Sequence, residues 1–200
     1  MTYSIIGSGS VGAAIASQFA RSNITVGIAN TRGPDSIAPI VETLGSKVVP
    51  MTLQEALQAD VIILAVPFWA HRDVAKAAIS WQGKVVIDAT NAYGIPLSEL
   101  DNLPSSAIVA KALSGAFLVK AFNHLSAQVL AQHPATPDGH RVLFLSSDNE
   151  DACATVAALV ARLGYAPISL GKIAEGGQLV QARDKSWAPL IFQDLFKQEQ

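Results

Sequence analysis

Three glycines near the start of the chain, Gly7, Gly9 and Gly12, have the spacing of a loop that binds a dinucleotide. They follow a short apolar run, residues 3–6, and precede an alanine-rich stretch. In such a unit the first glycine permits a sharp turn out of a strand, and the second lets the backbone approach a pyrophosphate. The third lets a helix pack closely on the sheet. The motif therefore predicts a nucleotide-binding βαβ unit rather than a turn that is only rich in glycine.

The helix expected after this loop, Ser10 to about Arg21, supplies the groups that would hold phosphates. The first N–H groups of a helix have no partner within it, and the helix dipole favours an anion at that end. We therefore expect the backbone of Ser8, Ser10 and Val11 to face the phosphates of the cofactor. The two serine hydroxyls can donate further hydrogen bonds.

A second set of residues, Asn30, Thr31 and Arg32, follows the next predicted strand. NAD-binding proteins carry an acidic residue here that bonds to the adenosine ribose. A carboxylate would repel the additional phosphate of NADP, whereas a guanidinium can pair with it through two hydrogen bonds. Ser36, at the start of the following helix, can reach the same phosphate. These residues predict that NADP(H) is the cofactor.

Transfer of a hydride to or from a nicotinamide needs no side-chain nucleophile and no metal, so we look for residues that position two rings and exclude water. Ligands of open α/β sheets lie beyond the carboxyl ends of the strands. That rule selects six residues after the fourth, fifth and sixth predicted strands, which are Pro67, Phe68, Trp69, Asn91, Asn123 and His124.

Three of these residues are candidates for catalytic roles. Asn91 and Asn123 can hold a carboxamide or a ring carbonyl, although asparagine at a strand end is also a common turn residue. His124 could donate a proton to a reduced ring near neutral pH, or it could begin a helix in contact with solvent. Phe68 and Trp69 either wall the ring site or pack a helix on the sheet.

Short runs rich in Ile and Val alternate with stretches of helical spacing, which is typical of a parallel sheet covered by helices. We predict an α/β fold of Rossmann type: a doubly wound, mainly parallel sheet with helices on both faces, extended by a small C-terminal α/β continuation. Strands are expected at residues 3–6, 25–29, 47–49, 61–66, 84–88, 118–122, 141–146 and 165–169. A helix capped by Asn149 and ended by Gly164 is expected between the last two strands.

The chain has 200 residues, half of them apolar, which suffices for one domain with a substantial core. We expect a single NADP(H)-binding domain over residues 1–200. Its core covers about residues 1–131, and the C-terminal continuation covers about residues 140–200. The loop around residues 132–140, with two prolines and a glycine, lies between them.

Composition excludes several classes of function. The formal net charge is −2 and Lys and Arg do not cluster, so nucleic acid is not an expected partner. The longest apolar run, residues 61–70, contains Pro67 and is too short to cross a membrane. A single cysteine, Cys153, fits a reducing compartment, and we expect a cytoplasmic protein.

No metal site is expected, because the remaining histidines lack the spacing of metal ligands. They are His71, His133 and His140. Asp88 ends a predicted buried strand, and we expect it to bond to backbone groups rather than act as a general acid.

The C-terminal stretch SWAPLIFQDLF, residues 186–196, has large apolar residues at helical spacing. This face either folds back on the core or closes the active site of a neighbouring copy, and we favour the second arrangement, a homodimer. The residues of the face are Trp187, Leu190, Ile191 and Leu195, with Phe192 and Phe196 beside them.

Six segments of the chain, in order, resemble the coenzyme F420-dependent NADP oxidoreductase family. They are IIGSGSVG, NTRGPDS, DVIILAVPF, VVIDATN, VKAFNHL and EGGQL. The resemblance implies a Rossmann-type domain that binds NADP(H) and exchanges a hydride with a flavin-like ring.

Carried onto this sequence, the resemblance makes Ser8, Ser10 and Val11 the pyrophosphate loop. It makes Asn30, Thr31 and Arg32 the site of the ribose phosphate. It makes Val66 and Pro67 the strand end beside the nicotinamide. Ala65 and Asn91 are also expected to bind the cofactor. His124 departs from the threonine that usually follows the Lys-Ala-Phe-Asn segment, and related folds include flavin-reducing domains of ferric reductases.

The principal hypothesis is therefore an NADP(H)-dependent oxidoreductase whose small-molecule acceptor is F420, FMN, FAD or a similar ring. The alternative is an NADPH-binding sensor or partner-docking module without turnover. An enzyme like pyrroline-carboxylate reductase is disfavoured, because such enzymes follow the first domain with a long helical region, whereas strands continue here at Arg141 and Tyr165.

Overall fold

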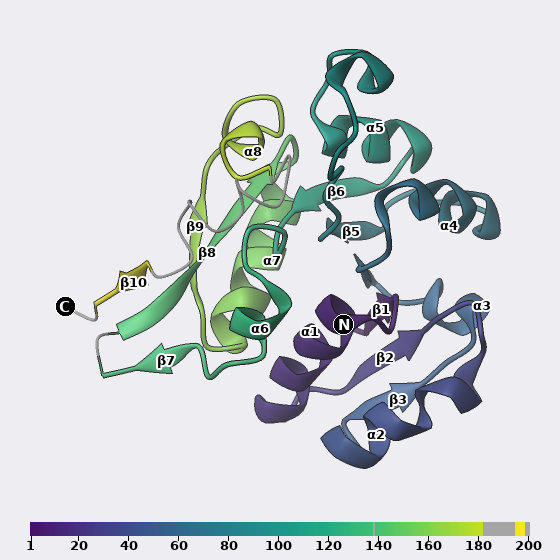
Figure 1. Ribbon diagram of the computed structural model, residues 1–200, viewed down its shortest axis with the longest axis vertical. Helices are drawn as coiled ribbons and strands as arrows, with labels where there is room; N and C mark the ends of the chain where they lie inside the picture. The colour runs from purple at the N-terminus through teal and green to yellow at the C-terminus, as the bar shows by residue number, and fades with distance from the viewer. Residues whose placement is uncertain (138, 182–194, 199–200) are drawn as a thin grey trace.

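A computed structural model describes residues 1–137, 139–181 and 195–198 of the chain. Its centre is a ten-stranded sheet with helices on both faces (Figure 1). The main strand order is β10-β8-β6-β5-β4-β1-β2-β3, and β7 and β9 also pair with β8. The order reverses direction at β1, which is the signature of a doubly wound sheet. The predicted Rossmann-type α/β class is confirmed.

The first part of the chain supplies six parallel strands. They are β1 (Tyr3–Ile6), β2 (Val26–Ala29), β3 (Val48–Pro50), β4 (Val61–Leu64), β5 (Val85–Asp88) and β6 (Phe117–Lys120). The helices between them are α1 (Ser10–Arg21), α2 (Ala38–Leu44), α3 (Leu53–Ala56), α4 (His71–Ala77) and α5 (Ser105–Ala112). Three 3-10 turns, η1 (Pro34–Ile37), η2 (Phe68–Ala70) and η3 (Leu97–Leu100), complete this part.

The second part of the chain continues the same sheet. It contains α6 (Ala127–Leu130), β7 (Ala135–Thr136), β8 (Gly139–Ser147), α7 (Glu150–Arg162), β9 (Ala166–Ser169), α8 (Gly176–Leu179) and β10 (Phe196–Lys197). Strand β8 runs antiparallel to β6 and parallel to β9. The predicted strands are therefore all present, and most boundaries differ by one or two residues.

Alternating side chains of the central strands contribute to two large apolar clusters, one on each face of the sheet, and a small third cluster includes Val142 and Phe144 of β8. Ile5 and Ile63 belong to the cluster under α1 and α7. Ile6 and Ile62 belong to the cluster under α3, α4 and α5. The strands are buried on both faces, which explains their nearly continuous Ile and Val content.

Helix ends follow local sequence signals. The Asn149 side chain accepts a hydrogen bond from the Ala152 backbone N–H at 2.8 Å and caps α7, as predicted. Gly164 ends that helix at a φ of +91°, a conformation that favours glycine. At α3, Thr52 and Glu55 form a reciprocal capping box.

The predicted C-terminal apolar helix falls mostly on residues 182–194, which lie outside the described residues. Leu195 and Phe196 are described, and Phe196 belongs to β10, where it pairs antiparallel with Arg141 of β8. The helical stripe predicted to include Phe196 is therefore wrong at that residue, because hydrogen bonds to β8 hold it extended. The Arg141 guanidinium lies 4.7 Å from the centroid of the Phe196 ring.

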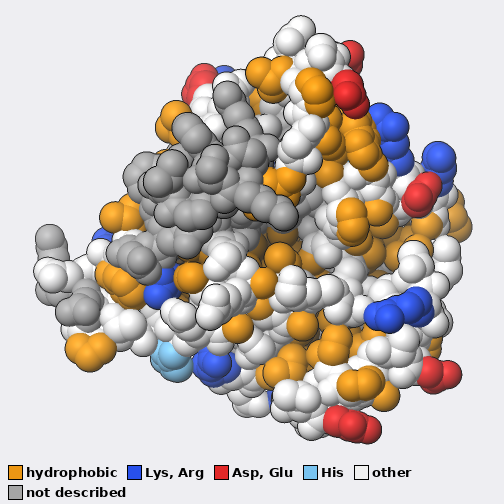
Figure 2. Space-filling model, viewed as in Figure 1, with side chains coloured by type: hydrophobic (Ala, Val, Ile, Leu, Met, Phe, Trp, Pro, Cys, Tyr) orange, Lys and Arg blue, Asp and Glu red, His pale blue; other side chains and the backbone are white. Residues whose placement is uncertain are grey.

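Charged side chains lie mainly around the border of the face shown in Figure 2, and its middle carries apolar and uncharged groups. Among the described residues, no helix has the length and apolar character needed to cross a membrane. The described part of the chain also contains no group of three or more His, Cys, Asp or Glu side chains that could hold a metal ion.

Candidate functional site

The glycine loop joins β1 to α1, and each of its glycines has a different structural reason. Gly7 has a φ of +116°, and a Cβ built on it would lie 2.1 Å from the Ala65 carbonyl oxygen. A Cβ on Gly12 would lie 1.9 Å from the Gly7 carbonyl oxygen. A Cβ on Gly9 would meet no atom of the described residues within 4 Å. A side chain at Gly7 or Gly12 would therefore clash with the protein backbone, whereas the space beside Gly9 is open to a ligand.

Helix α1 begins directly after this open space. Gly9 is its N-cap residue and has no side chain to satisfy the first N–H groups of the helix. Ser10 is exposed and Val11 is half-buried, so both reach the surface beside the loop. The free N–H groups and the helix dipole make this end suited to an anion.

Asn30 holds the glycine loop against the loop that follows β2. Its Nδ2 donates to the Ser8 hydroxyl at 2.7 Å and to the Ser36 hydroxyl at 2.9 Å. Its Oδ1 accepts from the Arg32 backbone N–H at 2.8 Å. Asn30 thus uses its amide to connect three predicted cofactor-binding residues to one another.

The Arg32 side chain is exposed and has no ion-pair partner within residues 1–137, 139–181 and 195–198. The turn that carries it is fixed by the Asn30 contact and by the Ser36 hydroxyl, which lies 2.8 Å from the Gly33 carbonyl oxygen. A cation is thereby placed at the end of β2, where an acidic residue would select NAD(H).

A first cavity of about 410 Å³, here called the loop cavity, lies along this edge. It is mostly apolar, and Asp73 is the ionisable residue that lines it in the described part of the chain. Its walls are Ile6, Gly7, Ser8, Gly9, Asn30, Thr31, Leu53, Ala65, Val66, Pro67, Ala70, Asp73 and Val74. Ser36 and Arg32 do not line it and lie on the loop beside it.

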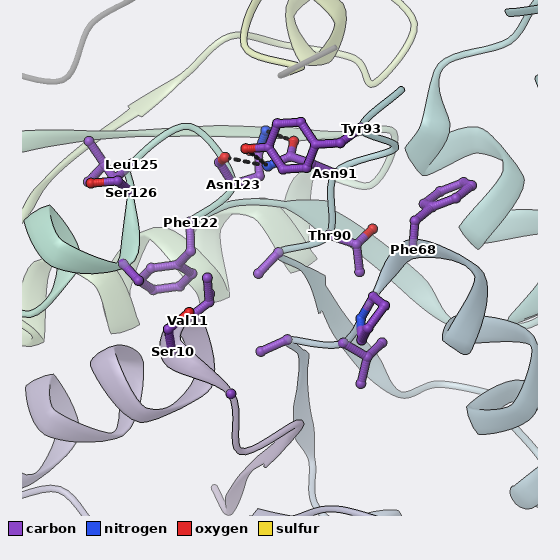
Figure 3. A pocket seen from close by; sticks show the side chains of 16 residues that line it. Ser10, Val11, Phe68, Thr90, Asn91, Tyr93, Phe122, Asn123, Leu125 and Ser126 are labelled. Atoms are coloured by element: carbon purple, nitrogen blue, oxygen red, sulfur yellow. Dashed lines mark hydrogen bonds between the residues drawn. The ribbon is translucent and has the colours of Figure 1, made fainter. Parts of the chain in front are cut away.

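A second cavity of about 410 Å³, here called the strand-end cavity, lies beyond the carboxyl ends of β4, β5 and β6 (Figure 3). Its walls are Gly9, Ser10, Val11, Ala65, Val66, Pro67, Phe68, Ala89, Thr90, Asn91, Tyr93, Phe122, Asn123, Leu125, Ser126 and Ala127. The two cavities share Gly9, Ala65, Val66 and Pro67. They adjoin at the glycine loop and together form one cleft.

Asn91 and Asn123 lie together in the strand-end cavity, next to Tyr93 (Figure 3). The Asn91 Nδ2 donates to the Asn123 backbone oxygen at 2.7 Å, and the Asn123 Nδ2 lies 3.3 Å from the Asn91 Oδ1. The Asn123 Nδ2 also donates to the Val180 carbonyl oxygen at 2.8 Å. These contacts fix both amides at the wall of the cavity, and they use both Nδ2 hydrogens of Asn123.

Phe122 lines the same cavity with an unusual backbone. It is buried, and its φ of +62° lies in the left-handed region, which is costly for a large side chain. Its ring meets Tyr165 edge-on, with the centroids 6.4 Å apart. The turn from β6 toward Asn123 is therefore forced by tertiary packing, and strain of this kind concentrates at functional sites.

His124 does not belong to the described walls of either cavity. It is 4 % exposed, and its ring packs 5.1 Å from the Phe144 ring. Burial lowers the pKa of His124 from 6.5 to about 4, and the Val142 backbone opposes this only in part. Burial of the ring contradicts the alternative that His124 contacts solvent. The lowered pKa counts against the prediction that His124 supplies a proton near neutral pH.

The two aromatic candidates after β4 have different positions. Phe68 is 5 % exposed and lines the strand-end cavity. Trp69 does not line it, and its ring instead lies 3.9 Å beneath the Arg72 guanidinium. Only Phe68 can therefore contact a ring held in the cavity.

Sequence reasoning missed several residues of the strand-end cavity. They are Ala89, Thr90, Tyr93, Phe122, Leu125, Ser126 and Ala127. Most carry no chemistry that a sequence search would select, but their place just after β5 and β6 follows from the strand-end rule. Tyr93 is 49 % exposed, and partial desolvation raises the pKa of its hydroxyl from the ordinary value of 10.

The fold and the cleft together define a Rossmann-type dinucleotide-binding protein. Residues 2–92 match the family model described as NADP oxidoreductase, coenzyme F420-dependent. That segment contains the glycine loop, the Asn30–Ser36 loop and Asn91. The resemblance to this family is thereby confirmed.

Solved structures match almost the full length of the chain. A hypothetical protein, SMa0349 from Sinorhizobium meliloti, is 41 % identical with a TM-score of 0.91, over 99 % of this chain and 96 % of that one. A candidate F420-dependent NADP-reductase from Arthrobacter sp. FB24 is 23 % identical with a TM-score of 0.72, over 90 % of each chain. The second similarity shows the fold alone.

One curated relative is the metalloreductase STEAP3 of Rattus norvegicus, which is 26 % identical over 181 residues. The match covers 88 % of this chain and 35 % of the relative. This chain thus spans about a third of the length of that protein.

Proposed function

We propose that this protein is an NADP(H)-dependent oxidoreductase that transfers a hydride between the nicotinamide and a small acceptor with a flavin-like or deazaflavin ring. The observation that carries the proposal is the cleft formed by two adjoining cavities, which share their walls at the glycine loop. A dinucleotide has the corresponding shape, with its pyrophosphate between two rings. The match of residues 2–92 to an NADP oxidoreductase family supports the same cofactor.

In this arrangement the adenosine end occupies the loop cavity. The pyrophosphate approaches the open face of Gly9 and the first N–H groups of α1. Thr31 and Arg32, on the loop held by Asn30, meet the additional phosphate of NADP(H). Ser36 contributes to this loop through its contact with Asn30 rather than through the cavity.

The nicotinamide occupies the strand-end cavity, beside Val66, Pro67 and Phe68. Asn91 and Asn123 orient its carboxamide or the polar edge of the acceptor ring. Hydride transfer then depends on stacking of the two rings and exclusion of water, and requires no side chain with a shifted pKa.

The cofactor assignment is tested by titrating NADPH and NADH into the parent protein and the Arg32→Ala variant by calorimetry. A charge-assisted hydrogen bond contributes about 1.5 to 3 kcal/mol, so Arg32→Ala is expected to bind NADPH roughly 10- to 100-fold more weakly and NADH almost unchanged. Equal affinity of parent and variant for both nucleotides would contradict the assignment of Arg32.

Turnover is tested by following the absorbance of NADPH with riboflavin, FMN, FAD and F420 in separate assays. Oxidation of NADPH by at least one of them supports the enzyme and identifies the acceptor class. Tight NADPH binding without oxidation by any of the four would favour the alternative, a non-catalytic sensor or docking module. The proposed homodimer is tested separately by light scattering of the full chain.

A further inference from the structure

An ion pair is buried behind the strand-end cavity. Asp88 ends β5 and Lys120 ends β6, and the two residues are direct partners in the register of the sheet. Asp88 is fully buried, Lys120 is 1 % exposed, and the Lys120 Nζ lies 3.1 Å from the Asp88 Oδ2. Neither residue lines either cavity.

The hydrogen bonds of this pair converge on one residue, Thr90. The Asp88 Oδ1 accepts from the Thr90 backbone N–H at 2.9 Å and from its hydroxyl at 2.7 Å. The Lys120 Nζ donates to the Thr90 carbonyl oxygen. Ser106 on α5 completes the network by donating to the Asp88 Oδ2 at 2.6 Å. The backbone N–H, the hydroxyl and the carbonyl oxygen of Thr90 thus all form hydrogen bonds with Asp88 or Lys120.

Stability alone is a poor explanation for this network. Two charges taken out of water incur a desolvation cost that their attraction often does not exceed, and apolar residues of similar volume often stabilise a fold as well. Burial alone would raise the pKa of Asp88, but Lys120 and the hydrogen bonds from Ser106 and Thr90 lower it below its usual value. The carboxylate therefore stays ionised as the acceptor for Thr90.

Thr90 is where this network reaches the cleft. It lines the strand-end cavity, and the next residue, Asn91, donates to the Asn123 backbone oxygen across the same cavity. The segment follows β5 and lies outside the helices and strands of the described residues. Asp88 and Lys120 hold Thr90 in this segment, and Asn91 is held in addition by its hydrogen bonds with Asn123.

We propose that Lys120 and Asp88 are positioning residues that hold the Thr90–Asn91 segment in the geometry needed to bind the nicotinamide half of the cofactor. This inference rests on the proposed NADP(H) function. The proposed role concerns the strand-end cavity and not the loop cavity. The hydrogen bonds of the network join Asp88, Lys120, Thr90 and Ser106, and none of these residues lines the loop cavity.

The test compares two ligands that differ in whether they carry the nicotinamide half of the cofactor. The compound 2′,5′-ADP fills only the adenosine end, whereas NADPH also carries the nicotinamide. Calorimetry gives the affinity for 2′,5′-ADP, and the fluorescence of the bound reduced nicotinamide reports its surroundings. The variants are Lys120→Met with Asp88→Leu, which removes both charges together, and the milder Ser106→Ala.

The double variant is expected to bind 2′,5′-ADP within about twofold of the parent and NADPH about tenfold more weakly, with a loss of nicotinamide fluorescence enhancement. Ser106→Ala is expected to weaken NADPH binding by about two- to threefold. If the double variant does not fold, the result for Ser106→Ala tests the inference instead. Equal weakening of both ligands, or no weakening of NADPH, would overturn the inference.

Gln18→Met is the matched control. Gln18 is fully buried and its amide donates to the Leu130 and Gln132 carbonyl oxygens, and none of these three residues lines either cavity. Its loss is expected to change the stability without separating the two ligands. A parent protein that binds 2′,5′-ADP and NADPH equally well would overturn the positioning role and leave the adenosine site intact. A parent that binds neither would overturn the proposed function itself.

Discussion

The loop cavity and the strand-end cavity are built in different ways, although they share a wall and have similar volumes. The loop cavity depends on backbone geometry within short segments, the glycine loop and the Asn30–Ser36 loop. The strand-end cavity depends on residues after three strands, held by a buried ion pair and by a strained turn at Phe122. The proposed phosphate site is therefore encoded by a local motif, whereas the proposed ring site exists only in the assembled sheet.

The largest expected effect is that of Gly7→Ala, which tests whether the local motif also supports the fold. A Cβ here meets the Ala65 carbonyl oxygen at 2.1 Å, and the backbone φ is unfavourable for alanine. We expect the free energy of unfolding to fall by roughly 2 to 5 kcal/mol, with loss of NADPH binding. Urea denaturation with a parallel NADPH titration measures both. An unchanged unfolding midpoint would show that the loop tolerates more rearrangement than its contacts imply.

Gly9→Ala separates ligand binding from folding at the same loop. The added methyl meets no protein atom within 4 Å, and Gly9 has an ordinary φ of −74°. Stability is expected to change by less than about 1 kcal/mol, because reduced freedom of the unfolded chain offsets a poorer N-cap. The methyl would stand where the pyrophosphate approaches, so NADPH affinity is expected to fall roughly 10- to 100-fold. Binding equal to that of the parent would place the phosphates elsewhere.

His124, which follows Asn123 of the strand-end cavity, is expected to make the stability sensitive to acid. Because burial lowers the pKa of His124 to about 4, the unfolded chain binds a proton at this residue in a range where the folded chain does not. More protons bound in the unfolded state mean that stability falls as the pH decreases from the unfolded pKa, near 6.5, toward 4. We expect a loss of about 2 kcal/mol from about pH 7 to about pH 5.

The measurement is urea denaturation at both pH values for the parent, His124→Gln and the exposed control His133→Gln. Of the two variants, only His124→Gln is expected to reduce the change in stability between the two pH values. Asp88 contributes at lower pH, because its pKa is lowered from 3.8 and its stabilisation is lost only as the pH falls through that lowered value. A parent whose stability is constant from about pH 7 to about pH 5 would show that folding does not lower the pKa of His124.

The smallest expected effect is that of Asp73→Asn, which refines the charge balance of the loop cavity. The Asp73 side chain is exposed, lies 3.9 Å from the Lys76 Nζ and lines the same cavity as Thr31. Removing its negative charge is expected to tighten NADPH binding about two- to threefold at low salt, with NADH unchanged and the difference lost at high salt. Asp151→Asn, on α7, is the control. Equal tightening of both nucleotides would show that Asp73 does not act on the additional phosphate.

The sequence alone determined the fold class and most of the loop cavity. Strand runs of Ile and Val, the glycine spacing and the Asn149 cap act over a few residues, and their outcome depends on backbone sterics that every chain shares. Asn91 and Asn123 were also found from sequence, because both follow parallel strands whose ends meet at one edge. The same rule selected His124 without revealing that its ring turns into the core.

Only the tertiary structure decided the remainder of the strand-end cavity. Nothing in the sequence distinguishes Lys120 from the other lysines and arginines. Its role depends on the strand register that places it beside Asp88. The neutrality of His124 and the forced turn at Phe122 likewise come from packing against Phe144 and Tyr165, which are distant in sequence. Burial and long-range charge pairing are properties of the assembled sheet, since no short segment contains both partners.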